Sequence, residues 1–343
     1  MTDENEQRER LLERIRRDCG PAMLDALSDP KVVEIIRNPD GRIWLDVAGQ
    51  GLIDSGHVMR PNVAASILKV CASLLDSPLT RETPILEGEF PLDGSRLQGL
   101  IEPLVDTPTF AIRKHAKHVF RLEDYAQAGM LRPGSHVEEA HGWDELIAAP
   151  TAIDAIKNAI LNRANILVVG GTGSGKTTLA NAINLAIAEL CPTDRVVAIE
   201  DTKELQLSVQ NHVILRATAE VSMQRLLRAT MRLRPDRIVV GEVRGSEAYT
   251  LLKAWNSGHP GGFATLHADS AQKGLQKLSD YVFEAPEAQA STTERIGRVI
   301  AGTVQLVLFI ERLSVAPWRA VSEVCRIRGY SNGSFDLQPL LSN

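Results

Sequence analysis

The second half of the chain alternates between short apolar runs and longer segments whose apolar residues recur at helical spacing. The apolar runs are rich in β-branched side chains, as buried strands are, and cover residues 166–169, 195–200 and 237–241. The helical segments cover residues 151–162, 176–190, 221–232 and 246–256. This alternation predicts a mostly parallel, doubly wound α/β sheet with ligands at the carboxyl ends of its strands. Strand-like runs on both sides of Asn332-Gly333 predict a hairpin appended to that sheet.

Residues 1–132 mix strand-like and helix-like patterns without such alternation, which predicts a smaller α+β domain. Its expected elements are two strands joined at Gly49–Gly51, a helix over 62–76, and strands within 95–104 and 109–115. Leu11, Leu12 and Ile15 share one face of a charged helix over 8–17, which either packs on this domain or contacts a partner. Residues 133–150 are polar and hold two prolines and two glycines, so we expect a linker there and a second domain over 151–343.

Composition narrows the class of protein. With 343 residues, 44% of them hydrophobic and 24% charged, the chain has the profile of a soluble protein of two domains. Its net charge of −5 argues against a protein that mainly grips nucleic acid, because neutralising phosphates takes a clustered cationic surface. We therefore expect no direct sequence-specific binding of nucleic acid.

Neither export nor a zinc site is indicated. The N-terminus is highly charged and lacks the apolar core of a signal peptide. The most apolar long stretch, residues 299–310, is too short to span a bilayer, so we expect a cytoplasmic protein whose membrane association is peripheral at most. The cysteines lie far apart without a C-x-x-C motif, at Cys19, Cys71, Cys191 and Cys325.

A glycine-rich turn between the strand at 166–169 and the helix at 176–190 is the strongest functional signal. Gly170, four residues, and then Gly175-Lys176-Thr177 match the phosphate-loop pattern G-x-x-x-x-G-K-[ST] in the expected strand-loop-helix context. A turn of this kind that binds nothing is the alternative, which the context disfavours. In a phosphate loop the amides and the helix N-terminus bind a polyphosphate, the lysine reaches its β and γ phosphates, and the threonine hydroxyl ligates Mg²⁺. The predicted nucleotide-binding residues are Gly171, Thr172, Gly173, Ser174, Gly175, Lys176, Thr177 and Thr178.

Carboxylates follow two of the predicted strands. Glu200 and Asp201 end the strand at 195–200, where one acid could orient or deprotonate water and the other could hold Mg²⁺ through its shell. Glu242 follows the strand at 237–241 in the Walker B position, although Gly241 stands where many phosphate-loop enzymes have aspartate. A helix cap or a solvated strand end is the alternative for each acid.

Histidines and arginines supply the remaining candidates. His267 follows the apolar run 263–266 and could donate to a γ-phosphate or be a satisfied core histidine, and a metal pair with His259 is only weakly indicated. Arginines matter because charge neutralisation drives phosphoryl transfer. Those singled out are Arg96, Arg113, Arg232, Arg234 and Arg244, together with Lys114.

Four motifs in order resemble the secretion traffic ATPases, the hexameric family shared by type II and type IV secretion and pilus assembly. They are "GGTGSGKTT", "AIEDTKEL" (Asp box), "LRPDRIVVGEVRG" (Walker B) and "GHPGGFATLHADS" (His box), which together cover most of the second domain. In the first domain "GSRLQGLIEPLV" and "TFAIRK" resemble the conjugation branch of the family. The absence of the tetracysteine motif found in many type II members also points towards type IV.

The resemblance implies a RecA-like P-loop NTPase domain preceded by a smaller α+β domain, and a homo-hexamer at the cytoplasmic face of the inner membrane that works with type IV secretion components. ATP with Mg²⁺ would bind between the two domains. Carried over by position, Glu200 would serve the attacking water, Glu242 would be the Walker B acid that holds Mg²⁺ together with Thr177, and His267 would be the His-box residue. Arg96 and Arg113 would contact phosphate from the first domain.

The leading hypothesis is therefore an ATPase motor of a conjugative type IV secretion system. One alternative is a helicase-like motor stimulated by single-stranded DNA, which the acidity and the lack of an aromatic-basic stripe disfavour. Another is a nucleotide-gated scaffold with little turnover, which the intact Lys176, Glu200 and Glu242 disfavour.

Overall fold

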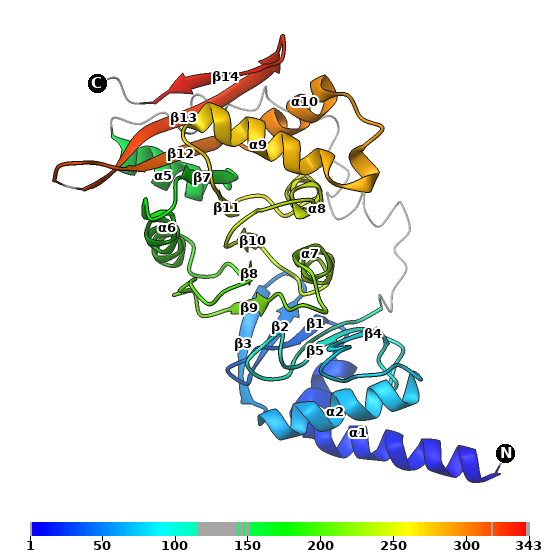
Figure 1. Cartoon of the computed structure of the whole chain (residues 1–343). Helices are drawn as coiled ribbons and strands as arrows, with labels where there is room; N and C mark the ends of the chain where they lie inside the picture. The colour runs from blue at the N-terminus through cyan, green and yellow to red at the C-terminus, as the bar shows by residue number, and fades with distance from the viewer. Residues whose placement is uncertain (1, 116–142, 144–146, 148–150, 317, 341–343) are drawn as a thin grey trace, which may run out of the picture. The chain divides into compact units, whose positions relative to one another are not determined.

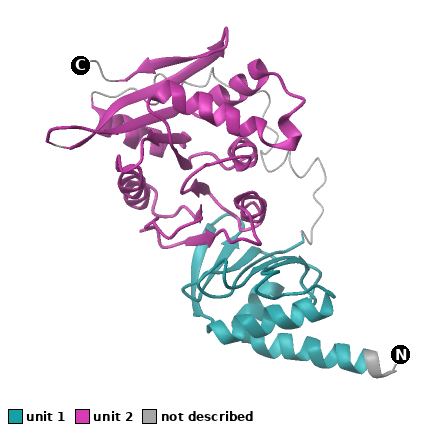
Figure 2. Cartoon of the chain, viewed as in Figure 1, with its two compact units in different colours: residues 1–139 teal, residues 140–343 magenta. Residues whose placement is uncertain are grey.

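The computed structural model describes residues 2–115, 143, 147, 151–316 and 318–340. The chain divides into two compact units, residues 1–139 and 140–343 (Figure 2), and each is described by itself. The predicted first-domain end at 132 and the linker over 133–150 fall mostly outside the described residues. These boundaries stay predictions.

In its described part, the first unit is an antiparallel sheet covered by two helices (Figure 1). The strand order is β3-β2-β1-β6-β5-β4. The elements are α1 (Thr2–Ser28), β1 (Val32–Arg37), β2 (Arg42–Val47), β3 (Gly51–Val58), α2 (Pro61–Leu74), β4 (Ile85–Glu89), β5 (Arg96–Leu100) and β6 (Thr109–Arg113). The predicted hairpin around Gly49–Gly51 and the predicted helix over 62–76 are confirmed as β2–β3 and α2.

The apolar face of α1 packs within the first unit. Ile15 is fully buried in a core cluster with Ile67 of α2, and Leu11 packs against the same cluster. Of the two alternatives for this helix, packing is therefore correct. The helix is longer than predicted and is interrupted at Gly20, whose φ of 69° departs from helical geometry next to Pro21.

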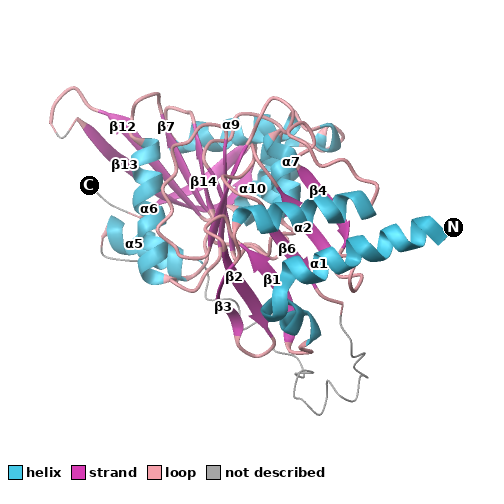
Figure 3. Cartoon of the chain, turned by 90° about the horizontal axis from the view of Figure 1, so that it is seen from below, coloured by secondary structure: helices cyan, strands magenta, loops and turns pink. Residues whose placement is uncertain are grey.

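The second unit is an eight-stranded sheet in the order β14-β13-β12-β7-β11-β10-β8-β9, with helices on its faces (Figure 3). The strands from β12 to β9 are parallel, and β13 and β14 add antiparallel strands at one edge. The elements are α5 (Ala152–Leu161), β7 (Ile166–Gly170), α6 (Lys176–Leu190), β8 (Val196–Glu200), β9 (His212–Arg216), α7 (Met223–Thr230), β10 (Arg237–Val240), α8 (Glu247–Trp255), β11 (Phe263–Leu266), α9 (Ala271–Phe283), η1 (Pro286–Ala288), α10 (Thr293–Thr303), β12 (Leu306–Arg312), β13 (Arg319–Ser331) and β14 (Ser334–Pro339). The predicted parallel sheet and the hairpin around Asn332-Gly333 are both confirmed.

The long apolar stretch over 299–310 is divided between two elements. It contains the end of α10 and most of β12, a buried strand paired with β7 on one side and β13 on the other. Its apolar character therefore reflects burial in the sheet. In the part of the chain that the structure describes, no helix combines the length and apolar content needed to cross a membrane.

Buried charges tie β8 and β10 together at the edge of the sheet opposite to their carboxyl ends. Arg237 begins β10 with its side chain buried, and its Nε donates to Asp194 Oδ2 at 2.6 Å. Asp194 Oδ1 also accepts from Arg163 at 2.7 Å. Arg237 further donates to the carbonyls of Gly261 and Ile160, at 2.8 and 3.0 Å. Because a buried arginine with its donors paired fixes the elements that it bridges, this network holds the register of the strands that carry the site.

Candidate active site

Four neighbouring strands bring the candidate residues to one edge of the sheet. In the order β7-β11-β10-β8, each strand ends at or just before one part of the site. The phosphate loop follows β7, His267 follows β11, Glu242 follows β10, and Glu200 ends β8. Because the four strands are parallel, their carboxyl ends share one edge.

The backbone of the phosphate loop requires glycine. Gly175 precedes α6 with a φ of 102°, a left-handed conformation that strains other residues. A Cβ on Gly170 would lie 2.4 Å from the carbonyl oxygen of Ile310 and 2.5 Å from Ser174 Oγ. Ser174 Oγ is buried without a hydrogen-bond partner in the described structure. The loop thus has the close backbone approach, the free hydroxyl and the helix N-terminus that suit a polyphosphate.

Lys176 begins α6 and lies over the loop with only 8% of its surface exposed. Its Nζ donates to the carbonyls of Gly170 and Gly171, at 3.0 and 2.9 Å. Burial lowers the pKa of Lys176, and the nearby Glu242 carboxylate acts in the opposite direction. The ammonium group is therefore held at the loop by weak carbonyl acceptors, an arrangement in which an anion can take their place.

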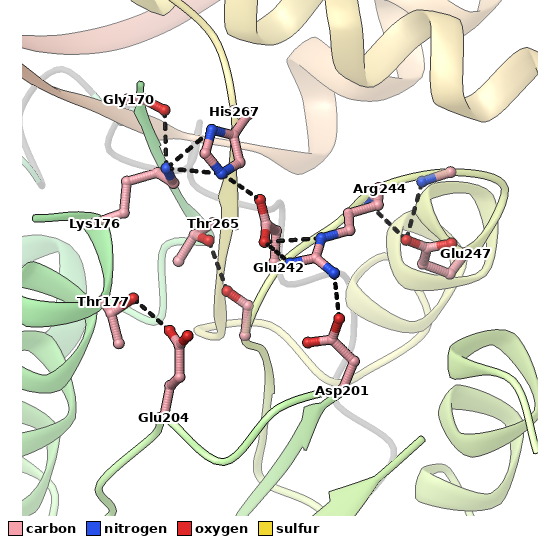
Figure 4. Close-up of polar contacts among 12 residues, drawn as sticks. Gly170, Lys176, Thr177, Asp201, Glu204, Glu242, Arg244, Glu247, Thr265 and His267 are labelled. Carbon is pink, nitrogen blue, oxygen red and sulfur yellow. Dashed lines mark hydrogen bonds and ion pairs between the residues drawn. The ribbon is translucent and has the colours of Figure 1, made fainter. Parts of the chain in front are cut away.

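His267 lies between Lys176 and Glu242 (Figure 4). Lys176 Nζ is 3.3 Å from its Nδ1 and 3.2 Å from its Nε2, and Nε2 is 2.9 Å from Glu242 Oε1. Burial first, and then the charge of Lys176, lower the pKa of His267, while Glu242 opposes them. A neutral imidazole suits these surroundings: Nδ1 can accept from Lys176, while Nε2 lies near Glu242 Oε1 without making a hydrogen bond to it. The His267 side chain is 37% exposed, which excludes the core-histidine alternative.

Glu242 is connected on its other side to Arg244. The Nε of Arg244 donates to Glu242 Oε2 at 2.9 Å, and its guanidinium also pairs with Asp201. The hydrogen bond with Glu242 is the main cause that raises the pKa of Arg244. Glu247 in the first turn of α8 accepts from the Arg244 amide at 2.6 Å and from the Gly245 amide at 3.0 Å. Figure 4 shows this chain of contacts, which continues from Lys176 through His267 and Glu242 to Arg244 and Asp201.

The glycine before Glu242 lies close to Glu200. A Cβ on Gly241 would lie 3.3 Å from the Cβ of Glu200 and 3.5 Å from the carbonyl oxygen of Ile199. The first distance is slightly tight and the second is ordinary contact, so a side chain here would require a small shift of Glu200.

Glu200 is 2% exposed and holds the loop that follows β8. Its Oε2 accepts from the amides of Glu204 and Leu205 at 3.0 and 2.9 Å, and its Oε1 lies 3.7 Å from Arg216 Nε. It also lines a cavity of about 30 Å³ together with Thr177 and other residues of the site. That volume is enough for one water molecule. Glu200 is thus neither the helix cap nor the solvated strand end that the sequence left as alternatives, and a loop-holding role has geometric support alongside a role near water.

Thr177 and Glu204 form the part of the site that suits Mg²⁺. Thr177 Oγ1 donates to Glu204 Oε2 at 2.7 Å. Among the described residues no cluster of three His, Cys, Asp or Glu side chains could hold a metal by itself. A hydroxyl with one or two nearby carboxylates fits Mg²⁺, which keeps waters and takes other oxygens from phosphate. Sequence reasoning missed Glu204, because its place depends on how the loop after β8 folds back on Glu200.

His259 takes no part in this site. It precedes β11 whereas His267 follows it, and its Nδ1 lies 3.1 Å from the Pro235 carbonyl oxygen. The two histidines therefore lie at opposite ends of one strand. The weakly indicated metal pair is wrong.

Arg96 and Arg113 lie next to each other in the first unit. They are cross-strand partners on β5 and β6, and both are exposed. Their outer neighbours in the same row across the sheet are Glu89 and Glu34, which places acids on both sides of the pair. Phosphate contact by these arginines stays a prediction.

The fold and the site define a phosphate-loop ATPase. A sequence profile described as "Type II/IV secretion system protein" matches residues 21–313, and the chain belongs to this family. The predicted resemblance to the secretion traffic ATPases is thereby confirmed, and with it the predicted ATPase activity. The RecA-like domain preceded by a smaller domain is likewise confirmed.

The individual relatives specify the branch of the family. The chain is 41% identical over 329 residues to the conjugal transfer protein TrbB of Rhizobium radiobacter, covering 96% of this chain and 94% of the relative. It is 40% identical over 329 residues to a probable TrbB of Sinorhizobium fredii, covering 96% and 93%. The crystal structure of the VirB11 ATPase from the Brucella suis type IV secretion system, in complex with sulphate, superposes with a TM-score of 0.82 at 28% identity, covering 93% of this chain and 96% of that one.

Proposed function

We propose that this chain hydrolyses ATP with Mg²⁺ and, as a homo-hexamer, powers a conjugative type IV secretion system. The observation that carries the proposal is the row of four adjacent strand ends that places Lys176, His267, Glu242 and Glu200 at one edge. The likeness to conjugal transfer relatives over nearly the whole chain supports the assignment to conjugation.

The phosphate loop and α6 bind the nucleotide. The amides of residues 171–178 and the N-terminus of α6 hold the phosphates, and Lys176 exchanges its carbonyl acceptors for the β and γ phosphates. Thr177 would hold Mg²⁺, and Glu242 would act on it through water. When bound, Mg²⁺ neutralises charge on the phosphates and orients them.

The acids act on the attacking water. Glu200 lines the cavity of about 30 Å³ and orients or deprotonates the water there, while it continues to hold the loop after β8. Arg244 holds the Glu242 carboxylate through Oε2, and His267 lies 2.9 Å from Oε1. The carboxylate so positioned would act on the Mg²⁺ shell.

His267 reports the presence of the γ-phosphate. Its ring contacts both Lys176 and Glu242, so a phosphate that draws Lys176 away also changes the partners of His267. Because Glu242 is linked onward to Arg244 and Asp201, the change can reach the loop after β8. Arg96 and Arg113 of the first unit would contact phosphate.

The hexamer would work at the cytoplasmic face of the inner membrane with other secretion components, attached peripherally. The motor would power either the transfer of substrate or the assembly of a pilus. A helicase-like motor and a nucleotide-gated scaffold stay as the alternatives, and no contact in the site favours either of them.

Mass measurement of the intact assembly, with and without ATP and Mg²⁺, paired with phosphate release, tests the proposal. We expect a species of six chains and steady phosphate release that depends on Mg²⁺. A hexamer that binds ATP without turnover would support the scaffold. Turnover that requires single-stranded DNA and falls steeply with salt would support the helicase-like motor.

A further inference from the structure

The hairpin of β12 and β13 runs past the phosphate loop on the side away from the acids. β7, which carries the loop, has β11 on one side and β12 on the other, so Glu242 and the β12–β13 hairpin lie on opposite sides of it. Ile310 on β12 is the register partner of Gly170, and β12 continues beyond it to Arg312. Figure 3 shows the two strands extending together beside α6. The hairpin therefore forms a wall next to the loop.

Arg319 of this wall lies against the phosphate loop, and Arg312 shares its face of the hairpin. Ile310 and Arg312 are two residues apart on one strand and so project to the same face, and Arg319 is the cross-strand partner of Arg312. A Cβ built on Gly175 would lie 3.4 Å from Ile310 Cδ1, 3.2 Å from Arg319 Cδ and 3.9 Å from Arg319 Nε. The side chain of Arg319 thus lies against the residue that precedes Lys176.

Neither arginine has a partner among the described residues. Arg312 and Arg319 are exposed, and neither makes a side-chain hydrogen bond or an ion pair within the part of the chain that the structure describes. Two like charges directly across a strand pair repel each other. Arg244, at the acid side of the loop, is by contrast paired with two carboxylates. The pair on the hairpin therefore offers its charge to an anion beside the loop.

The direction of a bound nucleotide follows from the rest of the site. Its γ-phosphate end must lie near Lys176, His267 and Glu242, which are on or beyond the β11 side of the loop. An elongated ligand that passes through the loop then leaves on the β12 side. We propose that Arg319, with support from the charge of Arg312, binds the α-phosphate of the nucleotide. This inference rests on the proposed binding of nucleotide at the phosphate loop.

Binding of ADP and of ATP with Mg²⁺ to the full chain, measured by calorimetry, tests the inference. Because a charge-assisted hydrogen bond is lost, Arg319→Ala should lower the affinity for both nucleotides by about tenfold or more. The two losses should be equal, since both nucleotides carry the α-phosphate. In hydrolysis the loss should appear in KM rather than in kcat, as it does when ground state and transition state lose the same contact. Arg319→Lys should recover part of the affinity, and Arg312→Ala should show a smaller loss.

Arg295→Ala is the matched control. Arg295 is an exposed arginine of α10, a helix that packs through Gly297 against Tyr330, far along β13 from Arg319. The Arg295→Ala variant should bind both nucleotides as the wild type does. All variants should keep the wild-type unfolding temperature.

The outcomes separate this inference from the function on which it rests. Wild-type affinity for ADP in Arg319→Ala, with binding lost in Lys176→Ala, would overturn the role of Arg319 and leave the phosphate loop intact. A loss of affinity for ATP alone would place Arg319 at the γ-phosphate and would also overturn its role at the α-phosphate. No nucleotide binding by the wild type would overturn the proposed function itself.

Discussion

Replacement of Glu200 by glutamine tests the one acid of the site for which the structure supports two roles. The carboxylate is buried, accepts from the amides of Glu204 and Leu205 through one oxygen, and faces Arg216 with the other. Glutamine keeps the shape and one oxygen acceptor for the two amides. Its NH₂ group then turns towards Arg216, so that two donors meet where a donor and an acceptor met before.

The size of the effect follows from this burial. Hydrogen bonds to a charged group contribute about 1.5–3 kcal/mol each, and glutamine keeps the acceptor but loses the charge, so we expect a cost of about 2 kcal/mol. In a unit of about 200 residues, 1 kcal/mol lowers the unfolding temperature by about 2–4 °C. Glu200→Gln should therefore unfold about 4–8 °C below the wild type. It should also lose at least about 100-fold in turnover if the acid acts on water.

Glu242→Gln is the matched comparison. Glu242 pairs with Arg244, whose side chain is 61% exposed, and a solvent-screened pair of this kind contributes less than about 1 kcal/mol. Its unfolding temperature should change by less than about 4 °C, with a loss in turnover of at least about 100-fold.

Thermal unfolding, bound-nucleotide content and phosphate release at 25 °C, all measured on the same samples, decide between the roles. Lower stability of Glu200→Gln with wild-type turnover would refute the catalytic role and leave only the role of holding the loop after β8. Lost turnover with unchanged stability would refute the loop-holding role. Wild-type values for both would show that neither role is correct.

Three further predictions concern other parts of the molecule. NMR titration of His267 should give a pKa below its ordinary value of 6.5, so the free energy of unfolding should rise with pH between the folded-state pKa and 6.5. Lys176→Met should raise the pKa of His267, because it removes a neighbouring positive charge, and an unchanged pKa in this variant would contradict the contact. Asp194→Asn should destabilise the second unit by about 3–5 kcal/mol in denaturant unfolding, because it leaves Arg237 buried without its countercharge, and a change below about 1 kcal/mol would show that the arginine finds other partners. Arg113→Ala should bind ADP normally, lose about tenfold in hydrolysis and lose any ATP-specific compaction in small-angle scattering, whereas wild-type behaviour would make it a surface arginine.

The sequence by itself determined the motif residues and many of the local elements, although β1, β4, β9, α9 and α10 were not predicted. Alternating strands and helices predicted the parallel sheet, and the parallel arrangement already implied that Glu200 and Glu242 share an edge with the phosphate loop. The glycines of the loop could be interpreted from their spacing because backbone conformation there is a local property. Hydrophobic periodicity and turn residues depend on neighbouring positions in the chain, so they predict helices, strands and turns.

Tertiary structure alone decided which residues touch. The strand order puts β11 between β7 and β10, and only this order places His267 between Lys176 and Glu242. The contacts of Glu204, the closeness of Gly241 to Glu200 and the approach of Arg319 to the phosphate loop depend on it as well. The same alternation of strands and helices is compatible with many strand orders, since periodicity shows which face of an element is buried but not which element covers it. Packing of the whole sheet selects one order, and the site follows from that choice.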